Sequence, residues 1–178
     1  RKQYSPATIR RKLSALSQLF DFYCECNAVD FNPIAGIKRP KHNRRQGKTP
    51  AISDEQMKLL LNAPPRDTLK GVRDRAIIAT FGYHGPRRAE VAALLVRHYS
   101  RRGGVKYFEI HGKGGKLRYV PVHPIAQVLI DRYLDMAGHY EELDGPLFRP
   151  ITNNATHEGL KRPLNPNSIY ANIIMPYA

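Results

Sequence analysis

The chain has 178 residues, which is long enough to bury a hydrophobic core without disulfides or metals. Its 29 Lys and Arg against 15 Asp and Glu give a formal net charge of +14 at pH 7, which favours a polyanionic partner, above all nucleic acid. No stretch approaches the roughly eighteen apolar residues of a membrane span, and no signal-peptide core is present. We therefore expect a cytoplasmic, nucleoid-associated protein without membrane contact.

The first predicted element is an amphipathic helix with Ser5 as its N-cap and Pro6 in its first turn. Apolar residues recur along it at spacings of three and four, which places them on one stripe. The members of this stripe are Ile9, Leu13, Leu16, Phe20 and Tyr23. Because a lone helix cannot bury such a stripe, residues 1–37 are predicted to be the C-terminal part of a helical domain.

Residues 38–50 are polar, basic and without periodicity, which predicts an interdomain linker. The cations of this linker are Lys38, Arg39, Lys41, Arg44, Arg45 and Lys48. They are candidates for contacts with DNA phosphates, and a merely solvated basic linker is the alternative.

A second domain is predicted over residues 51–178, beginning with a capping box formed by Ser53 and Gln56. Periodicity and turn residues then predict helices and two short strands in an α+β domain, mainly helical with a small antiparallel hairpin or sheet. The expected helices are 52–63, 72–83, 88–97, 125–136 and one after Asn165-Pro166, and the expected strands are 105–110 and 117–122.

The first motif with chemical potential is Gly85-Pro86-Arg87-Arg88-Ala89-Glu90, a turn that delivers an arginine to the start of a helix. Arg87 and Glu90 share a helix face, so the carboxylate can hold the guanidinium in one rotamer, as a phosphate clamp requires. An ordinary surface ion pair is the alternative.

The second motif is His111-Gly112-Lys113-Gly114-Gly115-Lys116-Leu117-Arg118, at the tip of the predicted hairpin. A lysine flanked by glycines can approach a phosphate or a leaving oxygen closely. A basic turn that only improves solubility is the alternative. The seven histidines include no His-x-x-x-His pair and have no accompanying carboxylate cluster, so we expect no metal site.

Together the motifs resemble the tyrosine recombinases of the phage-integrase family. The matching segments are Arg75-Ala76-Ile77-Ile78, the arginine motif continued to Val91, and Gly112 to Pro121, which resemble the family's first arginine box and lysine hairpin in order. Residues 5–41 resemble the last helix of the family's core-binding (SAM-like) domain, and Gly145-Pro146-Leu147-Phe148 resembles a loop that precedes the second active-site box. The resemblance implies that 51–178 is the N-terminal portion of a catalytic domain.

What the resemblance implies is DNA cleavage and rejoining without cofactor or metal, through a 3′-phosphotyrosyl intermediate. Arg87 would stabilise the scissile phosphate, Lys113 would be the general acid, and Glu90 would orient Arg87. Arg88, Lys116 and Arg118 would join the linker cations in binding DNA. The family continues after its last matching helix to a His-x-x-Arg box and a nucleophilic tyrosine, and neither follows the last predicted helix here. No nucleophile is therefore assigned, and this chain alone is predicted to be inactive.

The expected partner is double-stranded DNA, with a homotetramer on DNA for the full-length parent and no small-molecule substrate. The main alternative function is a non-catalytic DNA-binding module or regulator derived from a recombinase. A relative of type IB topoisomerases is a third possibility, and relaxation of supercoiled DNA without site preference would favour it.

Overall fold

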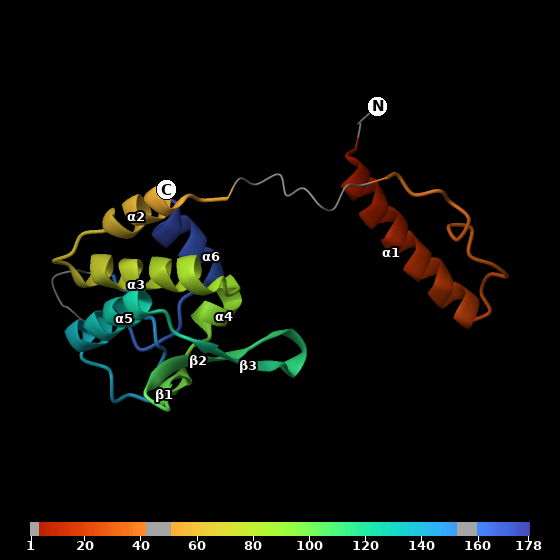
Figure 1. Cartoon of the computed structure of the whole chain (residues 1–178). Coiled ribbons are helices and arrows are strands. Elements are labelled where there is room, and N and C mark those ends of the chain that lie inside the picture. Colours follow the sequence, from red (N-terminus) through yellow and green to blue (C-terminus); the bar gives the residue numbers. More distant parts are fainter. Residues whose placement is uncertain (1–3, 42–50, 153–159) are drawn as a thin grey trace. The chain divides into compact units, whose positions relative to one another are not determined.

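The computed structural model describes residues 4–41, 51–152 and 160–178 (Figure 1). The chain divides into two compact units, Arg1–Ala51 and Ile52–Ala178. Most of the predicted linker, including Arg44, Arg45 and Lys48, lies outside the described residues. No helix in the described ranges is long and apolar enough to cross a membrane.

The first unit consists of helix α1 (Pro6–Glu25) and a segment that folds back along it. The predicted start is confirmed: the Ser5 hydroxyl accepts a hydrogen bond from the Thr8 backbone N–H at 3.3 Å. The returning segment is fastened where the Asn32 amide donates to the Ser17 carbonyl at 3.0 Å and the Arg39 guanidinium donates to the Ser14 hydroxyl at 3.0 Å. Helix α1 itself contains no buried residue. Within the described part of this unit Ile9, Leu13 and Phe20 of its apolar stripe are half-buried, and Leu16 and Tyr23 are exposed.

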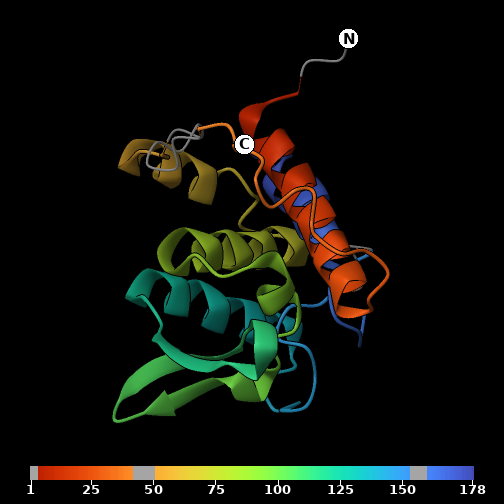
Figure 2. The same cartoon turned by 90° about the vertical axis from the view of Figure 1, so that its right-hand side faces the viewer.

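The second unit holds the hydrophobic core. Its helices are α2 (Asp54–Asn62), α3 (Leu69–His84), α4 (Arg88–Ala92), α5 (Pro124–Ala137) and α6 (Pro166–Ile169), the last continued by a π-helical turn, Tyr170–Ile174. Helices α2, α3 and α5 form successive layers, with the sheet beyond α5 (Figures 1 and 2). Ala76, Ile77 and Ala79 of α3 are fully buried, as are Ile130 and Leu134 of α5. The predicted capping box of Ser53 and Gln56 is confirmed at the start of α2.

The sheet has three antiparallel strands in the order β1 (Tyr99–Arg102), β2 (Val105–His111) and β3 (Leu117–Pro121). The predicted hairpin is confirmed as β2 and β3, and the predicted α+β class holds. The prediction of one helix over 88–97 was wrong, because α4 ends at Ala92 and a 3₁₀ turn, Val96–His98, leads into β1.

The early end of α4 has a cause in the tertiary structure. The backbone N–H groups of Val96 and Arg97 donate to the carbonyls of Gly145 and Leu143, both at 3.0 Å, instead of to carbonyls one helical turn back. The Leu147 N–H donates in turn to the Leu94 carbonyl at 2.8 Å. A distant loop therefore takes the hydrogen bonds that would have extended the helix.

Gly71 in α3 marks a close approach between two stretches of backbone, and its replacement is expected to be costly. A Cβ at position 71 would lie 2.1 Å from the Pro65 carbonyl oxygen, which cannot move away as a flexible side chain can. We expect Gly71→Ala to destabilise the second unit by about 3 kcal/mol in urea unfolding, despite the better helix propensity of alanine.

The matched control is Gly82→Ala in the same helix. A Cβ there would meet only the mobile end of Met57, whose Cε lies 1.9 Å away. We expect a loss below about 1 kcal/mol, because methionine repacks easily. Equal stability of the Gly71 and Gly82 variants would contradict the proposed backbone clash.

Candidate functional site

Arg87 is held by Glu90 at both its backbone and its side chain. Gly85 ends α3 in the left-handed conformation, with φ of 57°, and turns the chain so that Arg87 becomes the N-cap of α4. The Arg87 N–H donates to Glu90 Oε2 at 2.8 Å, and Arg87 Nη1 donates to Glu90 Oε1 at 2.8 Å. The Glu90 side chain is 5% exposed and that of Arg87 is 69% exposed, so a buried carboxylate orients an accessible guanidinium.

Arg118 of β3 binds the same carboxylate from the other side. Its Nη1 donates to Glu90 Oε1 at 3.1 Å, and its Nη2 donates to Glu90 Oε2 at 2.7 Å. Each oxygen of Glu90 thus accepts one hydrogen bond from Arg87 and one from Arg118. The Arg118 hydrogen bonds, followed by those from Arg87, outweigh burial and lower the pKa of Glu90 to about 2. Glu90 is therefore an anion at neutral pH.

The base of the lysine turn packs against this ion cluster. Residues Lys113–Gly115 form a short 3₁₀ turn, closed where the Gly112 N–H donates to the Lys116 carbonyl at 2.7 Å. A Cβ on Gly112 would lie 3.4 Å from Arg118 Nη1 and 3.7 Å from Glu90 Oε1. The structure therefore brings Arg87, Glu90, Arg118 and the base of the turn together. The Lys113 side chain lies outside what the structure describes, and its role stays a prediction.

The other predicted DNA-binding residues fall into two groups. Lys116 and Arg88 are exposed on the second unit, and the Arg88 guanidinium carbon lies 5.8 Å from the centre of the Tyr170 ring. Lys38, Arg39 and Lys41 are exposed on the first unit. The structure does not place these two groups relative to one another, so their common interface also stays a prediction.

The sequence did not reveal one cluster of ionisable groups, because the histidines have neither His-x-x-x-His spacing nor an accompanying carboxylate cluster. Ligand atoms of His98, Glu109 and His111 lie within 4.8 Å of one another in the described chain. Glu109 and His111 are two apart on β2, and this spacing could have revealed half of the cluster, since alternate residues share a strand face.

Hydrogen bonds within this cluster argue against a metal site. His111 Nε2 lies 3.1 Å from Glu109 Oε1, and His98 Nδ1 accepts the Leu95 N–H at 3.2 Å. Burial, followed by the charge of His111, lowers the pKa of His98 and favours its neutral form. A neutral imidazole that accepts at Nδ1 carries its proton on Nε2, which leaves no lone pair there for a metal ion. The cluster is better explained as a polar anchor at the end of β2.

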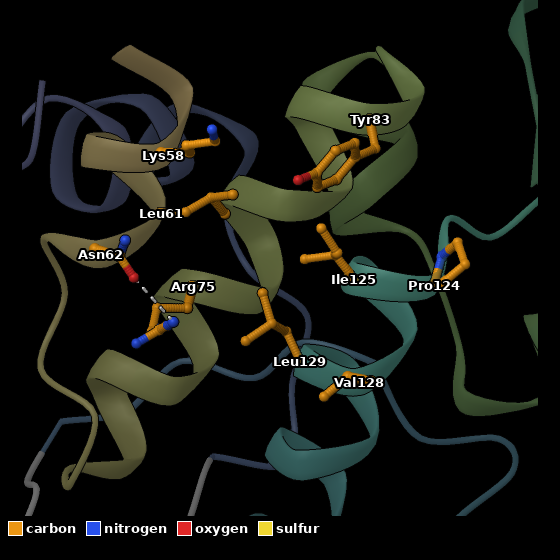
Figure 3. A pocket seen from close by; sticks show the side chains of 9 residues that line it. All are labelled: Lys58, Leu61, Asn62, Arg75, Tyr83, Pro124, Ile125, Val128 and Leu129. Carbon is orange, nitrogen blue, oxygen red and sulfur yellow. Dashed lines mark hydrogen bonds between the residues drawn. The ribbon is translucent and has the colours of Figure 1, made fainter. Parts of the chain in front are cut away.

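An apolar cavity of about 430 Å³ lies elsewhere, among α2, α3 and α5 (Figure 3). Leu61, Ile125 and Leu129 line its interior, and Arg75 reaches the Asn62 side-chain oxygen at 3.5 Å on one side. None of the predicted catalytic or DNA-binding residues lines this cavity, so it is separate from the cluster around Glu90.

Comparison with known proteins places the chain in a family. No protein-family model matches the sequence. Tyrosine recombinase XerC of Shewanella amazonensis is 32% identical over 148 residues, which cover 83% of this chain and 48% of the relative. Tyrosine recombinase XerC of Escherichia coli O127:H6 is 30% identical over 175 residues, which cover 93% of this chain and 57% of the relative. The chain belongs to the tyrosine recombinase family.

The family assignment agrees with a similarity of fold. The solved integrase from mycobacterium phage Brujita matches 99% of this chain and 54% of its own chain, with a TM-score of 0.50 and 18% identity. The XerC relatives confirm the resemblance inferred from the arginine and lysine motifs. The chain spans about half the length of the curated relatives it matches.

Proposed function

We propose that the chain is part of a site-specific DNA recombinase or integrase that cleaves and rejoins DNA through a 3′-phosphotyrosyl intermediate. The observation that carries this proposal is the convergence of Arg87, Arg118 and the base of the lysine turn on the Glu90 carboxylate. A buried anion that orients a largely exposed arginine beside a glycine-rich lysine turn suits the recognition of a phosphate.

In the proposed reaction a tyrosine oxygen attacks the scissile phosphorus, and the bond from phosphorus to the 5′-oxygen breaks. Arg87 binds a non-bridging oxygen, where negative charge grows in the transition state. The Lys113 ammonium gives its proton to the departing 5′-oxygen. We assign neither the tyrosine nor the second arginine box of the family to a residue of this chain, so the reaction is proposed for the whole protein.

We expect the chain itself to bind duplex DNA weakly and with strong salt dependence, because its net charge is +14. Fluorescence anisotropy of a labelled duplex over a salt series measures this directly. Arg87→Gln should reduce the slope of log K against log salt by about 1, the value for one lost phosphate contact. A slope unchanged by this substitution would contradict the role of Arg87.

The control for this measurement is Arg132→Gln, which also removes one positive charge. The Arg132 guanidinium donates to the Arg66 carbonyl at 2.9 Å and is not among the predicted DNA contacts. Its salt slope should equal that of the unaltered chain. We also expect no covalent adduct on a nicked duplex. An adduct that survives denaturing electrophoresis would show that a tyrosine of this chain is nucleophilic after all.

For the whole protein we propose assembly as a homotetramer on DNA, in the cytoplasm and associated with the nucleoid. Residues 1–37 would belong to a core-binding domain and residues 38–50 would run along the phosphate backbone. The exposed Lys38, Arg39 and Lys41 support this path. Light scattering of the whole protein with its DNA tests the assembly, and a complex containing a single protomer would contradict it.

A further inference from the structure

Arg118 has a setting different from that of a typical DNA-contacting arginine. It pairs with the buried Ile110 across the sheet, so its side chain starts from the sheet face that carries the buried Phe108 and Ile110. Its neighbours Leu117 and Tyr119 are exposed on the opposite face. Both terminal nitrogens of Arg118 donate to Glu90, although the side chain is 41% exposed.

The lysine turn needs a contact from outside to fix its conformation, because its own backbone can adopt several conformations. Gly114 and Gly115 have φ angles of 76° and 73°, which glycine adopts at little cost and which leave the turn few constraints. A guanidinium that grips a carboxylate with two parallel hydrogen bonds fixes distance and orientation together. The turn closes at Lys116, and Arg118 lies two residues further on. The guanidinium of Arg118 therefore holds the chain at the base of the turn.

We infer that Arg118 is a positioning residue: it couples the lysine hairpin to Arg87 through the shared Glu90 carboxylate and does not itself bind a DNA phosphate. This inference rests on the proposed function, which it deepens. The coupling fixes the separation between the arginine motif and the lysine turn before DNA arrives. Lysine cannot replace Arg118 fully, because an ammonium lacks the planar fork.

The first test measures the hairpin by NMR in the 178-residue chain. We expect Arg118→Gln to speed amide hydrogen exchange at Gly114 and Gly115 by about tenfold, since the root of the turn is released. Arg118→Lys should restore the rate only partly, and it keeps the charge if the glutamine variant folds poorly. The control is Arg102→Gln. Arg102 lies in the same sheet, but it pairs with Glu109 at 3.7 Å and not with Glu90.

The second test separates positioning from DNA contact. Arg118→Gln should weaken duplex binding at every salt concentration without changing the salt slope, whereas loss of a phosphate contact lowers the slope by about 1. The inference is overturned if the salt slope falls by about 1. It is also overturned if the amides of the lysine turn exchange at the same rate as in the unaltered chain. If the unaltered chain fails to bind duplex DNA, the proposed function fails, and the exchange measurement still decides the role of Arg118.

Discussion

Glu90→Gln is expected to destabilise the second unit by about 2 kcal/mol at pH 7. The substitution keeps the shape but replaces one acceptor oxygen by an amide that faces N–H donors, and it leaves two guanidinium groups without their anion. Breaking a fully buried pair costs about 3–5 kcal/mol. The cost here is lower because Arg87 and Arg118 are 69% and 41% exposed, so water compensates part of the loss. Urea unfolding followed by circular dichroism measures the difference.

The same variant should alter the response to acid. The pKa of Glu90 is lowered from 4.5 to about 2 in the fold, so the stability that its charge provides is complete above pH 4.5. That stability is lost as the pH falls from 4.5 toward 2, because the unfolded state takes up the proton first. The difference between the unaltered chain and Glu90→Gln should therefore shrink over this range.

Glu141→Gln is the matched control, because Glu141 is exposed and its carboxylate forms no ion pair within the described residues. Its unfolding free energy should stay within about 0.5 kcal/mol of the unaltered value at each pH. The assigned charge state of Glu90 is refuted if the unaltered chain and the Glu90 variant differ as much in unfolding free energy at pH 2 as at pH 7.

The fold could be predicted from the sequence wherever local chemistry decides it. Ser5 and Ser53 cap helices in the structure as their sequence context indicates, and glycine-rich spacing located the hairpin. Prediction failed after Ala92, where the apolar Leu94 and Val96 continue a helical pattern. Their backbone partners lie in the loop around Gly145, about fifty residues away, and no local pattern reports such a contact.

The candidate site shows the same division between local and distant contacts. Arg87 and Glu90 are three residues apart on one helix, so their pairing follows from helical spacing alone. Arg118 reaches Glu90 from a position 28 residues away, and only the docking of the hairpin reveals that contact. Sequence reasoning therefore found the pair of Arg87 and Glu90 but not the contact of Arg118 with the same carboxylate. The contact of His98 with Glu109 and His111 is likewise distant in sequence, because His98 lies in the 3₁₀ turn before β1 and the other two lie on β2.

Asp74→Asn should have the largest effect on stability, a loss of about 3–4 kcal/mol, because it breaks a fully buried ion pair. The Asp74 side chain is 0% exposed, and Arg73, 5% exposed, donates to its Oδ1 from Nε at 2.9 Å and from Nη2 at 2.6 Å. On its other oxygen Asp74 accepts from Lys70 Nζ at 3.0 Å and from the Tyr177 hydroxyl at 3.2 Å. The variant leaves the Arg73 charge buried beside an amide.

The pair of Arg73 and Asp74 also fastens distant segments to α3, which gives a second measurement. Arg73 Nη1 donates to the Arg149 carbonyl at 3.0 Å, and Tyr177 belongs to the segment that follows α6. We therefore expect faster amide exchange at Tyr177 in Asp74→Asn, beyond the increase that global destabilisation explains. Asp67→Asn is the control, since Asp67 is exposed just before α3, and its unfolding free energy should change by less than about 0.5 kcal/mol. If both variants lose the same stability, the buried pair does not hold α3 to these segments.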